Sequence, residues 1–215
     1  GGNLVFAEVD PDTFCMTLDE IKRRVTKNTK GVIIVHFGGY VSPDIIKIRD
    51  YCKKNKLFLI EDASHAHGAS INNNKIGSIG DTGCFSFFST KILTTGEGGM
   101  LTTNSKDIYD YAIALRERGR KINSKIEIYD YEWRSCRVPE ISALLGLSQL
   151  SHLSEFTEKR NKIASIYNGI IKKNKFLKAL PQQNGIVCAY WKHITLIENK
   201  NIDRKDLSVL LKNDY

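Results

Sequence analysis

The stretch GVIIVHFGGYVSPDIIKIRDYCKKNKLFLIEDA, residues 31–63, predicts a strand, a helix and a second strand in succession. Residues 31–37 form a continuous β-branched apolar run, which is expected of a strand buried on both faces. Pro43 can open a helix over residues 43–55, where apolar side chains recur on one stripe. Residues 56–63 supply the second strand. This order favours an α/β fold in which a mostly parallel sheet is flanked by helices.

Two more strands are predicted downstream, over residues 83–89 and 98–104. In α/β sheets of this kind, ligands bind at the carboxyl ends of the parallel strands. His36, Asp62 and Lys91 each lie at or just past such an end. We therefore expect the chemically important side chains along one rim of the sheet.

From about residue 105 onward the pattern is mainly helical. A long or bent helix is expected after residue 138, and residues 185–198 are a further strand candidate. We expect residues 1–150 to form a large domain, and residues 151–215 to form the long helix and the start of a smaller α+β domain. Because the sequence begins and stops within such patterns, we expect it to be a piece of a longer protein.

The composition of the chain bears on whether it binds nucleic acid, a membrane or zinc. The chain has 215 residues and a formal net charge of +8, but its lysines are scattered along helical stretches. Solvated helix faces are therefore favoured over nucleic-acid binding, which calls for basic blocks interleaved with aromatic residues. The sequence has no run of about 18 apolar residues and no export leader, so we expect no membrane association. Five widely spaced cysteines without a CxxC pair favour reduced thiols in the cytoplasm over disulfides or structural zinc.

The segment EDASHAHGA, residues 61–69, gathers acids and histidines at the end of a predicted strand. The acidic pair is compatible with a metal site, a general acid–base pair or the cap of a following helix. His65 and His67 are two residues apart, which does not match the HExxH spacing of helical zinc sites. We therefore expect no metal here.

Three segments together resemble one family. They are EDASHAHGA (61–69), KIGSIGDTGCFSFFSTKILTTGEGGMLTTN (75–104) and RVPEISALLGLSQL (137–150). The chain resembles the DegT/DnrJ/EryC1/StrS family of sugar aminotransferases, which depend on pyridoxal phosphate and have the transferase fold type I. By this comparison residues 1–150 belong to the cofactor-binding domain. The family's usual beginning and end are absent, so the chain is expected to be the central piece of an enzyme.

The resemblance implies a role for four residues. Lys91 would hold the cofactor aldehyde as a Schiff base and serve as the catalytic residue, which a partly desolvated amine suits. Asp62 would face the pyridine nitrogen and keep it protonated. His65 would lie over the cofactor ring, and Ser86 would bind its phosphate. The alternatives are a surface lysine, an aspartate that caps a helix or forms a buried ion pair, a rim histidine without a catalytic part and a serine bonded to backbone.

The segment around residue 137 resembles the part of the family that reaches the neighbouring subunit's active site. The family pattern there is Asn, any residue, Arg, Met, whereas this chain has Ser135, Cys136, Arg137 and Val138. Serine can bind a phosphate with less reach than asparagine, and Arg137 retains a guanidinium suited to a phosphate or nucleotide of the substrate. The resemblance therefore implies a homodimer with shared active sites.

The function implied is transfer of an amino group from glutamate or glutamine to a nucleotide-linked keto-sugar. The product would serve polysaccharide, lipopolysaccharide or related amino-sugar synthesis. One alternative is a dehydratase of the same family, in which histidine replaces the lysine. Another is a cofactor-binding or regulatory protein without turnover. Lys91 argues against the dehydratase.

Overall fold

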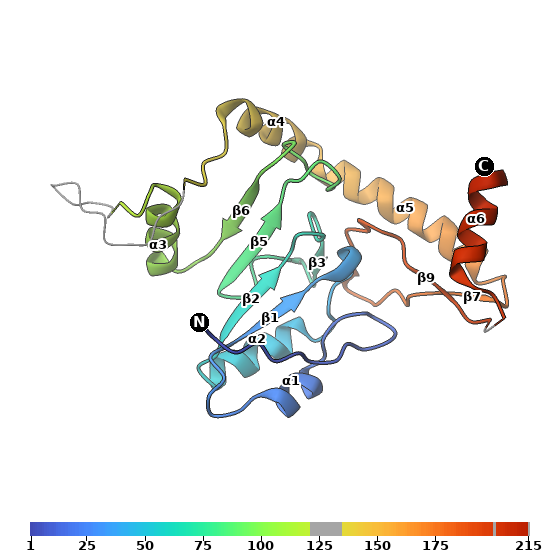
Figure 1. Ribbon diagram of the computed structural model, residues 1–215, viewed down its shortest axis with the longest axis horizontal. Coiled ribbons are helices and arrows are strands. Elements are labelled where there is room, and N and C mark those ends of the chain that lie inside the picture. The colour runs from blue at the N-terminus through green and yellow to red at the C-terminus, as the bar shows by residue number, and fades with distance from the viewer. Residues whose placement is uncertain (121–134, 200, 215) are drawn as a thin grey trace.

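The structure is a computed structural model, and it describes residues 1–120, 135–199 and 201–214. At its centre lies a four-stranded sheet in the order β1-β2-β5-β6, in which β1, β2 and β5 are parallel and β6 is antiparallel to β5 (Figure 1). The strands are β1 (Gly31–Val35), β2 (Phe58–Asp62), β5 (Thr82–Ser86) and β6 (Gly99–Thr102). The mostly parallel α/β sheet predicted from residues 31–63 is therefore confirmed.

One face of the sheet is covered by two helices, α1 (Leu18–Arg24) and α2 (Ile45–Lys54). Buried side chains of β1 and β2 join those of both helices in one hydrophobic core. The core residues contributed by these elements are Ile21, Val32, Ile34, Ile45, Ile48, Cys52 and Leu59. The helix expected from Pro43 thus forms, and it carries its apolar stripe onto the sheet.

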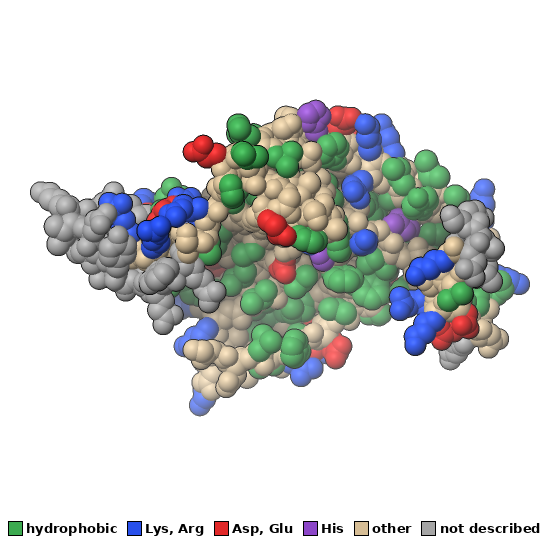
Figure 2. All heavy atoms as spheres, turned by 45° about the horizontal axis from the view of Figure 1, so that its top comes forward, with side chains coloured by type: hydrophobic (Ala, Val, Ile, Leu, Met, Phe, Trp, Pro, Cys, Tyr) green, Lys and Arg blue, Asp and Glu red, His purple; other side chains and the backbone are tan. Residues whose placement is uncertain are grey.

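The expectation that residues 31–37 are buried on both faces is wrong for this chain. Along β1 buried and exposed residues alternate, with Ile33 and Val35 52% and 40% exposed. Phe58 of β2 lies on the same open face, since it pairs with Gly31. Figure 2 shows hydrophobic side chains exposed across the central part of the molecule. The reason is that the described residues supply helices for only one face of these strands.

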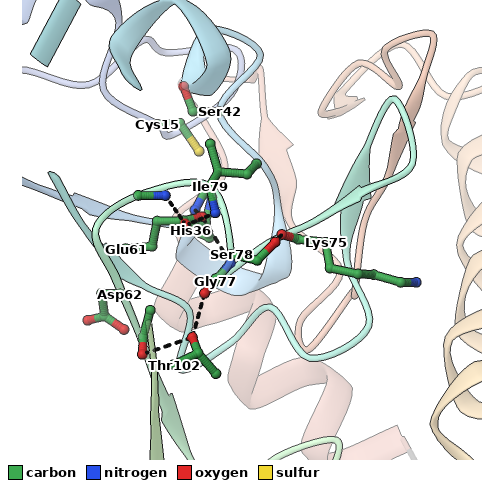
Figure 3. Close-up of polar contacts among 12 residues, drawn as sticks. Cys15, His36, Ser42, Glu61, Asp62, Lys75, Gly77, Ser78, Ile79 and Thr102 are labelled. Atoms are coloured by element: carbon green, nitrogen blue, oxygen red, sulfur yellow. Dashed lines mark hydrogen bonds and ion pairs between the residues drawn. The ribbon is translucent and has the colours of Figure 1, made fainter. Parts of the chain in front are cut away.

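A buried carboxylate connects the sheet to the loop before β5. Glu61, wholly buried on the helix-covered side, accepts hydrogen bonds from the backbone N–H groups of Gly77, Ile79 and Gly80 at 2.7–2.9 Å. Its Oε2 also lies 3.3 Å from Nε2 of the buried His36 (Figure 3). The loop that leads into β5 is therefore fixed to β2 by one side chain.

The remaining described elements lie around this sheet. They are η1 (Phe37–Gly39), β3 (Ser70–Ile71), β4 (Asn74–Lys75), α3 (Lys106–Arg116), α4 (Glu140–Ser151), α5 (Leu153–Ile171), β7 (Leu177–Ala179), β8 (Ile186–Val187), β9 (Thr195–Ile197) and α6 (Arg204–Asp214). None of the helices in the described ranges has both the length and the apolar character needed to cross a bilayer.

Of two predictions about the second half of the chain, one is confirmed and the other is wrong. The long helix is bent as expected, since α4 and α5 meet at His152. The single strand over residues 185–198 is wrong. Two short strands, β8 and β9, form there instead, and Tyr190 between them has a positive φ of 48° that no regular strand accommodates.

Candidate active site

Lys91 lies in a closed loop beyond the carboxyl end of β5. The N–H of Phe87 donates to the carbonyl of Gly98 at 2.8 Å, and the N–H of Thr95 donates to the carbonyl of Phe87 at 3.0 Å. The N–H of Lys91 donates to the carbonyl of Phe88 at 2.9 Å. Burial lowers the pKa of the Lys91 amine, while the charge of nearby Asp62 acts in the opposite direction. The loop therefore presents an amine that loses its proton more easily than a solvated lysine.

Gly98 is required for this loop to close. Its φ is +154°, and a Cβ added to it would lie 2.6 Å from Oγ1 of Thr95. The return of the chain after Lys91 therefore depends on glycine at this position.

Asp62 and Ser86 lie on the same face of the sheet. Asp62 pairs in parallel register with Cys84, and Ser86 comes two residues later on the same strand. Oδ1 of Asp62 accepts a hydrogen bond from the N–H of Ser64 at 3.0 Å, and Oγ of Ser86 accepts one from the N–H of Phe88 at 3.3 Å. Both side chains are partly buried at the rim where the parallel strands end.

His65 completes the group on the side of η1. Its Nδ1 accepts a hydrogen bond from the N–H of Gly38 at 3.3 Å, so the ring proton lies on Nε2. Burial lowers the pKa of His65, the charge of Lys91 lowers it further, and Asp62 opposes both. The imidazole is therefore neutral near pH 7, and it lies within electrostatic range of both other groups.

The groups brought together match the chemical needs of pyridoxal phosphate. The cofactor requires an amine for its aldehyde, a carboxylate at its ring nitrogen, a flat surface against its ring and hydroxyl or N–H donors for its phosphate. Lys91, Asp62, His65 and Ser86 supply one of each, at the same rim of the sheet. The residues present therefore fit the cofactor that the sequence resemblance implies.

Two other histidines do not belong to this group of rim residues. His36 follows β1 as expected, but its side chain is fully buried against Glu61. His67 is buried beside the rings of Phe85 and Phe87, and neither of its ring nitrogens has a partner among the described residues. The expectation that His36 faces the rim is thus not met.

Ser135 and Arg137 lie apart from the Lys91 group within this chain. Ser135 forms a β-bridge with Glu117, just after α3, and Nη1 of Arg137 lies 2.9 Å from Oε2 of the same glutamate. Both residues are exposed. Among the described residues, no contact joins either of them to Asp62, Ser86 or Lys91.

Trp191 also contacts the site, because its indole N–H donates a hydrogen bond to the carbonyl of Thr90. No sequence pattern marks this contact, since the two residues lie 101 positions apart in the chain. Trp191 also lines a cavity of about 600 Å³ between α5 and the segment before β9. Three cationic side chains and three further phenylalanine or tyrosine rings share that lining, namely Lys159, Arg160, Lys192, Phe156, Tyr167 and Tyr190. A basic, partly aromatic cavity thus adjoins the Lys91 loop.

Comparison with known proteins agrees with this geometry. The chain is 33% identical over 216 residues to a GDP-perosamine synthase of Vibrio cholerae, covering 98% of this chain and 57% of that protein. It is 34% identical over 183 residues to a dTDP-4-dehydro-2,3,6-trideoxy-D-glucose 4-aminotransferase of Saccharopolyspora spinosa, covering 80% of this chain and 47% of that enzyme.

Among solved structures, the aminotransferase TlmJ from Streptoalloteichus hindustanus matches with a TM-score of 0.90 and 27% identity. That match covers 98% of this chain and 57% of TlmJ. Helicobacter pylori PseC, an aminotransferase involved in pseudoaminic acid biosynthesis, matches with a TM-score of 0.88 and 27% identity over 97% of this chain and 57% of PseC. The chain therefore has the fold of these aminotransferases and spans little more than half their length.

The family comparison extends over the whole sequence, since residues 1–215 match a single family model. The match includes the segments around Asp62, Lys91 and Arg137 from which the resemblance was inferred. The chain belongs to the DegT/DnrJ/EryC1/StrS aminotransferase family.

Proposed function

We propose that the protein containing this chain is a pyridoxal-phosphate-dependent aminotransferase. It transfers an amino group from glutamate or glutamine to a nucleotide-linked keto-sugar, in the synthesis of polysaccharide, lipopolysaccharide or related amino sugars. The observation that carries this proposal is the position of Lys91, whose amine has a lowered pKa at the rim that also presents Asp62 and His65. The substrate class rests on the sugar aminotransferases and GDP-perosamine synthases among the relatives.

Bound pyridoxal phosphate supplies an electron-accepting ring that stabilises the carbanion left when a substrate carbon loses a proton. Lys91 would hold the cofactor through its amine, and its Nζ, once released, would move the proton at the substrate carbon as a base. Asp62 keeps the ring nitrogen protonated, and His65 covers the ring. Ser86 donates its hydroxyl to the phosphate.

Lys91 also favours transamination over dehydration. The dehydratases of this family have histidine in place of the lysine, and a histidine cannot hold the cofactor through an amine. The basic cavity beside Trp191 adds support for an anionic substrate, because Lys159, Arg160 and Lys192 line it.

We extend the proposal to the assembly. Two copies form a homodimer in the cytoplasm, with residues 1–150 as the cofactor-binding domain and residues 151–215 as the start of a smaller domain. Ser135 and Arg137 reach the partner's cofactor phosphate and substrate, which is consistent with their exposure and their distance in the chain from Lys91. Arg137 must then exchange its ion pair with Glu117 for the new anion.

The test uses the full-length protein with added pyridoxal phosphate. A visible absorbance band should appear as the cofactor condenses with Lys91. Borohydride should fix the cofactor on the peptide that contains this residue. Lys91→Ala and Lys91→Arg should both lack the band, since arginine keeps the charge but not the reactive amine. A band of wild-type intensity in Lys91→Ala would refute the assignment.

Turnover is tested separately. Glutamate should abolish the band and release 2-oxoglutarate, and a nucleotide-linked keto-sugar should restore the band and become aminated. Binding of the cofactor without either change would identify a non-catalytic binding protein. Loss of water from the sugar without amination would identify a dehydratase.

A further inference from the structure

Trp191 touches both residues that we place at the cofactor ring. Its indole is stacked on the imidazole of His65, with ring centroids 3.9 Å apart and an interplanar angle of 10°. Nζ of Lys91 lies 4.6 Å from the centroid of the same indole. The indole Nε1–H of Trp191 donates a hydrogen bond to the carbonyl of Thr90 at 2.8 Å. One side chain from the second half of the chain thus joins the two segments that build the site.

The backbone that carries Trp191 is held against η1. The N–H of Ala189 donates to the carbonyl of Gly39 at 2.9 Å, and the N–H of Lys192 donates to the carbonyl of Gly38 at 3.0 Å. Gly38 in turn donates its N–H to His65. The position of the indole is therefore set by the same turn that sets the orientation of the imidazole.

This arrangement leaves His65 with two unlike ring faces. Trp191 covers one face in parallel stacking, and Phe37 approaches the ring edge-on at 6.1 Å and 70°. Parallel stacking restricts rotation of the imidazole about its side-chain bonds, because any tilt breaks the contact.

We propose that Trp191 is a positioning residue that supports the imidazole of His65 from behind, so that the other imidazole face lies flat against the pyridine ring of the cofactor. The inference rests on the proposed function, since it concerns how that function's cofactor is bound. Trp191 acts through His65, and the indole N–H to Thr90 serves to hold the indole in place. An aromatic ring at position 191 is what the site requires.

The experiment measures the affinity of the full-length protein for pyridoxal phosphate, by titrating the visible band. Trp191→Leu should weaken binding about three- to tenfold, the range expected for loss of an aromatic stacking partner. Trp191→Phe keeps a ring on His65 without the N–H, and its affinity should stay within about twofold of the wild type. Phe176→Leu is the matched control, because it removes a ring that lies under Lys175 at 5.0 Å, away from this site.

A double variant separates positioning from a general structural role. If Trp191 acts through His65, His65→Ala with Trp191→Leu should bind the cofactor no more weakly than His65→Ala alone. Circular dichroism and the urea midpoint verify that each variant folds. If Trp191→Leu does not fold, Trp191→Met takes its place as the non-aromatic variant.

Two results would overturn the inference while leaving the proposed function intact. One is wild-type affinity in Trp191→Leu, and the other is a full additional loss when Trp191→Leu is added to His65→Ala. Absence of the visible band in the wild type is a different outcome. It would refute the proposed function itself, and with it this role of Trp191.

Discussion

Glu61 and Asp62 are neighbours in the chain, and their side chains point to opposite sides of β2 (Figure 3). Glu61 points to the helix-covered side, where it binds His36 and three backbone N–H groups. Asp62 points to the open side, toward the rim that holds Lys91 and His65. The alternation of a single strand therefore divides the acidic pair into a structural carboxylate and a candidate functional one.

Glu61→Gln should lower the free energy of unfolding by about 3 kcal/mol. The amide replaces one acceptor oxygen with an NH₂ group, which leaves buried N–H donors of the loop before β5 without a partner. Urea denaturation at pH 7 measures the change. Asp62→Asn is the matched control, and it should weaken cofactor binding while leaving the urea midpoint nearly unchanged. Equal loss of stability in both variants would contradict this division.

The pH dependence of the same carboxylate has a definite sign. Burial alone raises the pKa of Glu61, but hydrogen bonds from His36, Gly80 and Gly77 outweigh it and hold the pKa below its usual value. The unfolded chain therefore binds this proton at a higher pH than the folded chain does. Glu61 contributes its full stabilisation at pH values above its pKa in the unfolded chain, about 4.3. This stabilisation is lost as the pH falls through the pKa that Glu61 has in the folded chain.

Because of His67, the free energy of unfolding should fall as the pH is lowered from about 6.5 to about 4. Burial and the charge of Lys91 lower its pKa to about 4, so the unfolded chain takes up a proton in this window while the folded chain does not. His67→Leu should reduce the slope of unfolding free energy against pH by at most about 1.4 kcal/mol per unit. Urea denaturation at several pH values provides the slope.

Two other histidines contribute to the same pH dependence. His65 and His193 also have lowered pKa values from burial, so part of the slope should remain in His67→Leu. If His67→Leu has the wild-type slope, His67 is already protonated in the folded chain or accessible to water.

How much the sequence could predict depends on the range of the interactions involved. The β1-α2-β2 unit followed from local patterns, namely a β-branched run, a proline and an apolar stripe. Asp62, His65 and Lys91 were identified from motifs, and parallel pairing brings them to one rim. Trp191 could not be identified, because its contact with Thr90 joins residues 101 apart and its segment resembled a strand. The turn at Tyr190 that breaks that strand is set by tertiary packing.

The open sheet face shows the same limit. The apolar run of residues 31–37 correctly indicated a sheet position, but burial on the second face requires a covering layer that the described residues lack. Ile34→Ala should therefore cost about 3 kcal/mol in this chain, because Ile34 is fully buried under α2. Ile33→Ala, at the adjacent but 52% exposed position, should cost less than about 1 kcal/mol. Equal costs by urea denaturation would mean that the second face is covered.

Gly39→Ala and Gly169→Ala should change stability in opposite directions. Gly39 has φ +91°, and a Cβ there would lie 2.8 Å from the carbonyl oxygen of His65 and 2.9 Å from the N–H nitrogen of Trp191. These are backbone atoms that cannot move aside alone, so the substitution should cost about 2–4 kcal/mol. It should also weaken cofactor binding, because it pushes His65 and Trp191 apart.

Gly169 provides the control for this substitution. It lies exposed in α5 with no atom within 4 Å of an added Cβ, so alanine should stabilise the helix by about 0.5–1 kcal/mol. Thermal or urea unfolding of the two variants gives the signs, and titration with pyridoxal phosphate gives the second readout. A Gly39→Ala protein with wild-type stability and cofactor affinity would show that η1 does not set the distance between His65 and Trp191.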